Sequence, residues 1–174
     1  PVTSTLISGE KDAVLVDAQF SVNDAKNLVK LVQDSGKNLK YIIITSGDPD
    51  YYFGLEPLVQ AFPNAKVIAT PEVIKHIEAT KEGKFAYWGP ILKAGAPSQI
   101  IVPRAIEDKT IKLEGEKIEI KASGKYASYL WIPSNRTILG GVGLSSGIHL
   151  WTADTQTTEA RDEWRKTVKQ MNRL

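Results

Sequence analysis

Two aspartates, Asp48 and Asp50, are the residues of this sequence whose type and position could most readily do chemistry. They stand two residues apart around Pro49 in the turn "SGDPD", directly after the apolar stretch 40–45. Such a run is typical of a buried strand, and ligands of open α/β sheets bind beyond the carboxyl ends of strands. Carboxylates there could bind a divalent cation or act in acid–base chemistry. They could also cap the following helix or hydrogen-bond within their own turn.

The other residues of that turn and the scarcity of histidine limit the alternatives. Ser46 has no base nearby and no Gly-x-Ser-x-Gly elbow, which disfavours a serine nucleophile. The chain contains two histidines, His76 and His149, and no cysteine. A zinc centre of three histidines therefore cannot be built from one chain, and cysteine-ligated metal sites are excluded.

The two histidines have different predicted surroundings. His76 falls off the apolar side of a helix predicted at 71–83, so we expect it on the surface. His149 is predicted in a strand at 147–154, beside Trp151. It could line a pocket opposite the aspartate turn, although a strand histidine satisfied by a backbone carbonyl is the commoner case.

The elements that must position these residues alternate in type over the first half of the chain. Strands are predicted at 4–8, 13–18, 40–45 and 65–70, and helices at 21–36, 54–62 and 71–83. Ser21 is predicted to cap the first helix and Thr70 the last of them. Because strands and helices alternate, we expect an α/β layer with parallel pairing.

The second half has a different pattern. Residues 84–106 are rich in proline and aromatic residues and are predicted to form a loop-rich cover segment. Alternating stretches at 110–122, 128–141 and 147–154 then predict an antiparallel meander. The final segment 157–174 is predicted to be an amphipathic helix. We expect one domain over residues 1–174, with mixed sheets and outer helices.

The bulk composition excludes several classes of function. The 174 residues carry a formal charge of +2 and 42% hydrophobic residues, which is ordinary for a soluble domain with a core. We expect no nucleic-acid partner, because the charge is small and the basic residues are scattered. We also expect no membrane segment, because no apolar run approaches about 20 residues. A cytoplasmic and an exported location both remain open.

The stretch 45–54 resembles the first metal motif of the metallo-β-lactamase-fold superfamily. In that family a buried strand ends in Thr-His-x-His-x-Asp-His, usually followed by a glycine and a helix. Thr45 and Asp50 match the threonine and the aspartate, and Gly54 falls at the glycine. The three histidine positions are occupied by Ser46, Asp48 and Tyr51.

The resemblance extends over most of residues 3–145. The opening hairpin is similar to that of the family, which ends in an aspartate beneath the metal site, here Asp17. The segment 64–77 resembles the strand and helix after the motif, and 128–141 resembles a later hairpin. The resemblance implies a metallo-β-lactamase-like αββα sandwich, incomplete at its ends or altered from an active relative.

The resemblance also implies a site, and this sequence departs from it. Asp48 and Asp50 are the implied metal ligands, Asp50 is the implied catalytic residue, and Asp17 supports them from below. The implied pocket residues are Ser46, Tyr51, Tyr52 and His149. Tyr51 could ligate a metal only as a phenolate. The bridging aspartate of the family would fall near Val142, and valine cannot bind a metal.

Two interpretations of function follow. The first is a metallo-β-lactamase-fold hydrolase-like protein with an impaired metal centre, weakly active or inactive. It would hold one divalent ion weakly (zinc, manganese or iron) or none, and would take a small-molecule ester, lactone or amide. The second is a non-catalytic binding or structural protein, or an engineered variant, that retains only the fold. We also expect a homo-oligomer, because open sheet edges invite pairing.

Overall fold

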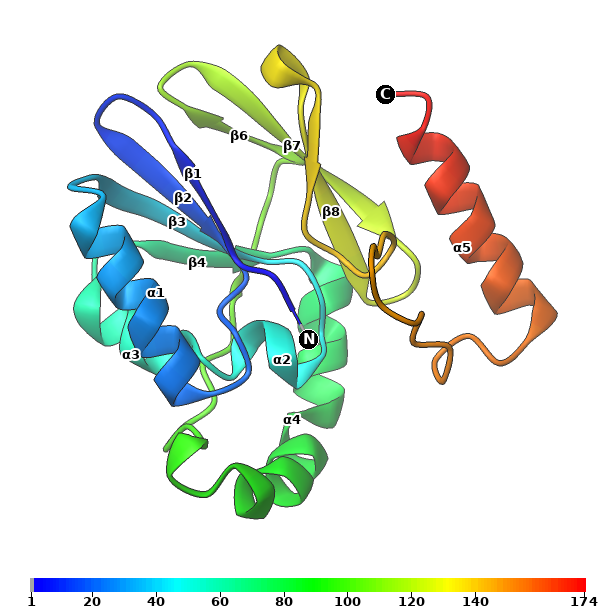
Figure 1. Cartoon of the computed structure of the whole chain (residues 1–174), viewed down its shortest axis with the longest axis horizontal. Helices are drawn as coiled ribbons and strands as arrows, with labels where there is room; N and C mark the ends of the chain where they lie inside the picture. Colours follow the sequence, from blue (N-terminus) through cyan, green and yellow to red (C-terminus); the bar gives the residue numbers. More distant parts are fainter. Residues whose placement is uncertain (1) are drawn as a thin grey trace.

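A computed structural model describes residues 2–174 as two packed β-sheets with helices outside them (Figure 1). The first sheet has the strand order β1-β2-β3-β4-β5 and the second the order β6-β7-β8-β9. The strands are β1 (Thr5–Ser8), β2 (Asp12–Val16), β3 (Asn38–Ile44), β4 (Lys66–Ala69), β5 (Arg104–Ala105), β6 (Thr110–Leu113), β7 (Glu116–Ser123), β8 (Ala127–Ile132) and β9 (Thr137–Leu139). The helices are α1 (Val22–Asp34), α2 (Pro49–Tyr52), α3 (Leu55–Ala61), α4 (Pro71–Leu92) and α5 (Thr158–Met171), with short 3-10 turns at Lys93–Gly95 and Pro133–Asn135. This arrangement confirms the predicted mixed α/β sandwich.

The first sheet is mixed. β1 and β2 form an antiparallel hairpin, whereas β2, β3, β4 and β5 run parallel to one another. Side chains of a strand alternate between its two faces. Ala13 and Leu15 therefore pack beneath the helices, in the cluster that also holds Leu28 of α1 and Ile77 of α4. The outer helices thus bury one face of this sheet.

The other face of the first sheet packs against the second sheet. Val14 and Val16 of β2 and Ile43 of β3 share a buried cluster with Ile118 of β7 and Leu130 of β8. The second sheet is an antiparallel meander, as predicted from its alternating sequence. Two apolar layers result, one on either side of the first sheet, and together they fix the ends of β2 and β3.

The predicted helix starts are confirmed where a capping side chain is present. Ser21 caps α1 by accepting a hydrogen bond from the Asp24 backbone N–H at 3.1 Å. Thr70 caps α4 by accepting from the Val73 N–H, and Thr157 caps α5 by accepting from the Ala160 N–H. Each cap satisfies a backbone donor that the first helical turn leaves without a partner.

The loop-rich segment predicted from residue 84 onwards is wrong over its first part. α4 continues through Gly83 and Pro90 as far as Leu92. Aromatic packing explains this, because Phe85 contacts Phe53 and Trp88 contacts Phe20, with ring centroids 6.4 and 5.1 Å apart. Tertiary contacts outweigh the low helix propensity of glycine and proline here.

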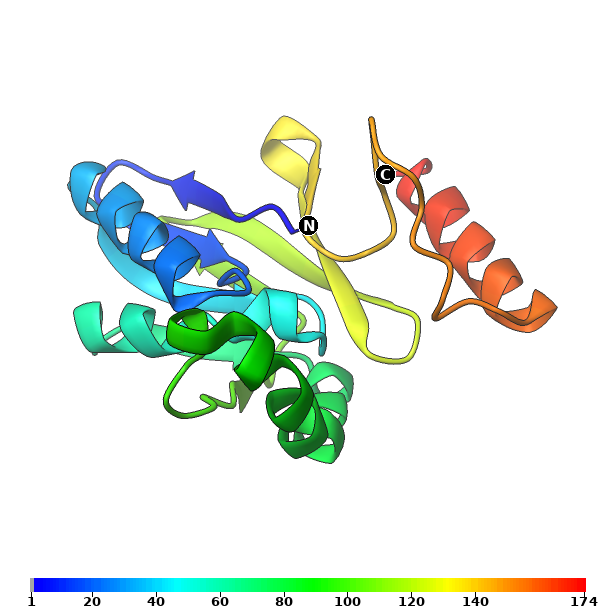
Figure 2. The ribbon, with the colours of Figure 1, turned by 60° about the horizontal axis from the view of Figure 1, so that its bottom comes forward.

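A second correction concerns residues 147–154, which were predicted to form a strand. They are irregular, and His149 in the middle of them is exposed. The segment 140–157 leads instead to α5, which lies beside the second sheet, away from α1 and α3 (Figure 2). The Trp164 indole Nε1 donates to the Gly143 carbonyl at 2.8 Å, and Met171 is buried. The Trp164 bond attaches α5 to the segment that precedes it.

Candidate functional site

The turn that follows β3 lies at the junction of the two sheets. The Gly47 N–H donates to the Tyr126 carbonyl at 3.0 Å, and the Ser128 N–H donates to the Thr45 carbonyl at 2.7 Å. Ser46 forms an isolated antiparallel bridge with Ala127 and is fully buried. The β7–β8 connection therefore holds the backbone of the aspartate turn in place.

Asp17 lies beneath this turn, at the end of β2. One of its carboxylate oxygens accepts the Thr45 N–H and the other accepts the Thr45 hydroxyl, both at 2.7 Å. Thr45 Oγ1 in turn accepts the Gly141 N–H at 2.8 Å. Burial raises the pKa of Asp17 to about 7, although the hydrogen bonds from Thr45 oppose that rise.

Asp48 forms an ion pair with a residue that the sequence did not single out. The Lys84 ammonium Nζ, on α4, lies 2.6 Å from Asp48 Oδ1. The same Nζ lies 3.4 Å from His76 Nε2. Because an ammonium group can only donate, Nε2 accepts in this contact and the imidazole proton lies on Nδ1. Partial burial and the Lys84 charge hold the pKa of His76 below its usual value.

His76 is held against the turn by two further contacts. Its ring stacks on the ring of Tyr126, with centroids 4.1 Å apart and planes at 16°. A Cβ on Gly47 would lie 2.7 Å from His76 Cδ2, so the imidazole reaches this position only because residue 47 is glycine. The expectation that His76 is a surface histidine is therefore wrong, since it is half-buried and packs against the turn.

The two tyrosines after Asp50 both point inward. Tyr51 and Tyr52 are in helical α2, where they are 9% and 1% exposed, so neither faces solvent. Burial, with the charges of Asp17, Asp50 and Asp48, raises the pKa of Tyr51 well above its usual value. Tyr51 therefore stays a neutral phenol, and its hydroxyl lies 3.5 Å from the Gly141 carbonyl oxygen. The buried Tyr52 hydroxyl has no hydrogen-bond partner among residues 2–174.

The remaining predicted site residues are less closely engaged. Asp50 lies half-buried in α2 and makes no hydrogen bond or ion pair with any residue that the structure describes. Ser46 Oγ accepts the Asp48 N–H at 3.3 Å, so this serine supports the turn. His149 is not brought to the site, because it lies in the exposed segment before α5. Asp154 of that segment accepts the Trp151 indole N–H at 3.0 Å and adds negative charge near His76 and Tyr126.

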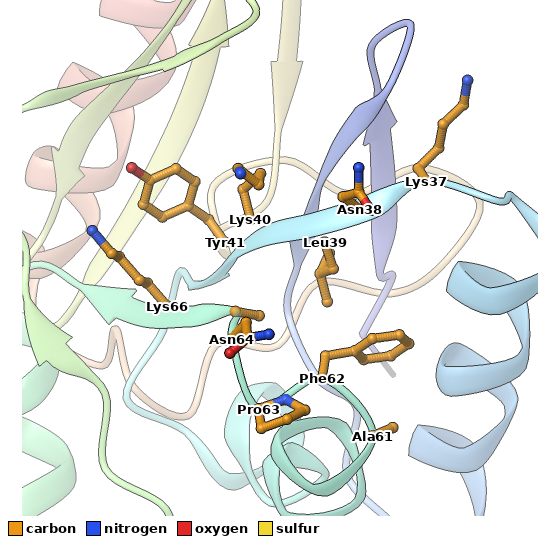
Figure 3. A pocket seen from close by; sticks show the side chains of 11 residues that line it. Lys37, Asn38, Leu39, Lys40, Tyr41, Ala61, Phe62, Pro63, Asn64 and Lys66 are labelled. Atoms are coloured by element: carbon orange, nitrogen blue, oxygen red, sulfur yellow. The ribbon is translucent and has the colours of Figure 1, made fainter.

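A cavity of about 560 Å³ lies at the opposite end of the first sheet (Figure 3). It is lined by the starts of β3 and β4 and by the segment after α3, and Figure 3 shows Leu39 pointing toward Phe62. Its polar lining includes three lysines, two of which, Lys37 and Lys66, extend outward. None of the predicted site residues lines it, so we place the candidate site at Asp48 and not at this cavity.

A comparison with known families decides the classification. The family described as the metallo-beta-lactamase superfamily matches residues 1–165. The chain belongs to this superfamily.

Solved structures of the superfamily show the same fold. The metallo-beta-lactamase from Pontibacter korlensis superposes with a TM-score of 0.72 at 17% identity, over 98% of this chain and 74% of that one. DIM-1 metallo-beta-lactamase exposed to ceftazidime gives a TM-score of 0.71 at 16% identity, over 99% of this chain and 73% of that one. At these identities the likeness concerns the fold alone.

One curated relative is similar in sequence over a shorter stretch. Uncharacterized protein YobT of Bacillus subtilis (strain 168) is 34% identical over 68 residues, which are 39% of this chain. The match spans 29% of the Bacillus protein, well under two thirds of its length.

Members of this superfamily usually bind divalent metals such as zinc. Over residues 2–174, the His, Cys, Asp and Glu side chains form no group of three or more that could hold a metal ion. Catalytic zinc uses three protein ligands and structural zinc four. The residues that the structure describes therefore do not fit such a centre.

No helix in residues 2–174 is both long and apolar enough to span a bilayer.

Sequence reasoning missed Lys84 and misplaced His76. The spacing of the two residues could have indicated their contact, because side chains eight positions apart in a helix lie on neighbouring faces. That signal required α4 to extend past Gly83, whereas the glycine and the following aromatic residues favoured a loop.

Proposed function

We propose that this protein is a metallo-β-lactamase-fold, hydrolase-like protein with an impaired metal centre, weakly active or inactive in hydrolysis. The Lys84–Asp48 ion pair is the observation that carries this proposal, because it occupies one of the two carboxylates at the motif. Tyr51 adds support, since its raised pKa keeps the phenol neutral. The motif then offers Asp50 as its one free carboxylate.

Asp48 and Asp50 remain the donors we propose for any divalent ion, which would have to displace Lys84 from Asp48, and Asp17 supports the turn through Thr45. Two carboxylates fall short of the three protein ligands of a catalytic zinc site, so binding of zinc, manganese or iron is expected to be weak. Without a tightly held ion, the pKa of water stays far above neutrality and no strong nucleophile forms. Any residual acid–base role would fall to Asp50.

A second candidate is a non-catalytic protein that binds a small molecule and retains only the fold. The buried Tyr52 hydroxyl favours this candidate, because a buried polar group without a partner costs free energy unless a ligand or water satisfies it. The stacked His76 and Tyr126 rings offer an aromatic wall to such a ligand. Binding without turnover would distinguish this candidate from a weak hydrolase.

The decisive experiment measures metal content and activity together. The protein is expressed with zinc, manganese or iron supplied, gel-filtered and analysed for metal, and its melting temperature is recorded with and without a chelator. We expect less than one equivalent of metal, an unchanged melting temperature, and little hydrolysis of generic esters, lactones and a chromogenic lactam. Stoichiometric metal that is lost in Asp50→Ala, with zinc-dependent turnover, would contradict the impaired centre.

A further inference from the structure

The ammonium group of Lys84 lies between two side chains of the kind that bind metals. Its Nζ is 2.6 Å from Asp48 Oδ1 and 3.4 Å from His76 Nε2. Carboxylate oxygens and imidazole nitrogens are both common zinc ligands. Lys84 Nζ therefore occupies a position where the Asp48 carboxylate and the His76 imidazole both lie within reach.

The surroundings of Lys84 hold it at that point. Asp48 and Lys84 are both largely removed from solvent, with side chains 28% and 24% exposed. His76 cannot swing away freely, because its ring stacks on the ring of Tyr126 and lies close to Gly47. Lys84 is carried on the same continuous helix as His76, and α4 is capped at Thr70. The three groups therefore form a defined site with its own cation.

We propose that Lys84 is a built-in cation that takes the place of a divalent metal ion at this site and excludes it. The inference deepens the proposed function, on which it rests, because it states which residue impairs the centre. A lysine ammonium is a compact charge with three donors, so it can neutralise Asp48 and donate to His76 at once. A metal ion would have to displace it, and the displaced ammonium would lose its carboxylate partner.

The test removes the ammonium and measures metal affinity. Lys84→Met keeps most of the length of the side chain and frees both Asp48 and His76. We expect its affinity for zinc alone, measured by titration calorimetry, to exceed that of the unaltered protein by about tenfold or more. Lys81→Met is the matched control, because Lys81 lies on the same helix but pairs locally with Glu78. It should leave zinc affinity unchanged.

Two further variants identify the donors. In the Lys84→Met background, Asp48→Asn and His76→Ala should each abolish most of the gain, because each removes one of the freed ligands. If Lys84→Met fails to fold, Lys84→Gln, which is neutral and keeps a polar end, replaces it in the same series. Circular dichroism checks that every variant used is folded.

The possible outcomes separate this inference from the proposed function. A gain in Lys84→Met that depends on Asp48 and His76 supports the inference. Weak zinc binding in both the unaltered protein and Lys84→Met would overturn it and leave the impaired centre standing, since missing ligands alone would then explain the weakness. Tight, stoichiometric zinc in the unaltered protein would overturn both.

Discussion

At the scale of single residues, the site depends on buried groups that the turn after β3 brings together. Asp17 is the most deeply buried carboxylate of the site. Its backbone adopts a left-handed conformation with φ of 62°. A non-glycine residue rarely takes this conformation unless its surroundings impose it. The two hydrogen bonds from Thr45 and the bond from the Asp17 N–H to the Ile43 carbonyl at 2.9 Å supply that restraint.

The titration of Asp17 predicts how stability depends on pH. Its pKa is about 7 in the folded protein, against an ordinary value near 4, because burial disfavours the charged form. Between these values the folded state holds a proton that the unfolded state has released, so the free energy of unfolding falls as pH rises. We expect roughly 2–3 kcal/mol to be lost between pH 5 and pH 8 in urea denaturation.

Asp17→Asn removes this titration and should flatten the pH dependence, because the amide stays neutral throughout. Asp34→Asn, which changes an exposed carboxylate on α1, is the control and should behave as the unaltered protein does. The same slope in Asp17→Asn as in the control would show that another group is responsible.

Gly54 permits a close approach that no other residue allows. A Cβ at this position would lie 2.0 Å from the Ala18 carbonyl oxygen, which belongs to the backbone and cannot move aside cheaply. We expect Gly54→Ala to lower the free energy of unfolding by about 2–4 kcal/mol. Gly83→Ala is the opposite case, because a Cβ there has no neighbour within 4 Å and the residue lies inside α4.

Thermal and urea unfolding of the two variants check this prediction. Gly83→Ala should raise the free energy of unfolding by about 0.5–1 kcal/mol, the usual advantage of alanine over glycine in a helix. Equal stability of Gly54→Ala and the unaltered protein would contradict the close approach of this turn to Ala18.

At the scale of elements, Glu114 joins the two sheets at the end away from the site. It lies in the β6–β7 turn, and its carboxylate accepts the backbone N–H groups of Glu10, Lys11 and Asp12 at 2.6–2.7 Å. Glu10 and Lys11 belong to the β1–β2 turn, and Asp12 is the first residue of β2. The bonds hold the pKa of Glu114 below its usual value, because they favour the charged form.

Replacing the Glu114 carboxylate should loosen this connection between the hairpins. Glu114→Gln is expected to lower the melting temperature, because an amide has one acceptor oxygen for three donors. Glu116→Gln, which removes the neighbouring exposed carboxylate of β7, should not. Faster amide hydrogen exchange at Lys11 and Asp12 in Glu114→Gln alone would locate the effect, and identical exchange in the two variants would contradict it.

At the scale of the whole molecule, the two sheets leave edge strands that could pair with another copy. In the part of the chain that the structure describes, β1 and β5 border the first sheet and β6 and β9 the second. Self-association through such an edge stays a prediction. Sedimentation velocity over a wide concentration range should show a mass that rises with concentration. A constant mass equal to one chain would contradict it.

Much of the fold could be predicted from the sequence because its signals are local. Alternation between faces marked the strands of the meander, and Ser21 and Thr70 marked helix starts through side chains that bond within one turn. The extent of α4 could not be predicted in this way. Gly83 and Pro90 disfavour a helix locally, and only the packing of Phe85 and Trp88 on distant rings offsets that cost.

The sequence by itself determined the superfamily resemblance and the place of the aspartate turn, because a buried strand and the turn after it consist of consecutive residues. Only the tertiary structure decided what surrounds Asp48. Lys84 is 36 positions away along the chain and reaches the carboxylate because α4 packs into the apolar cluster that holds Ile44 at the end of β3. A carboxylate pairs with the cation that lies nearest to it in space. Tertiary packing sets that distance, and a local sequence pattern does not indicate it.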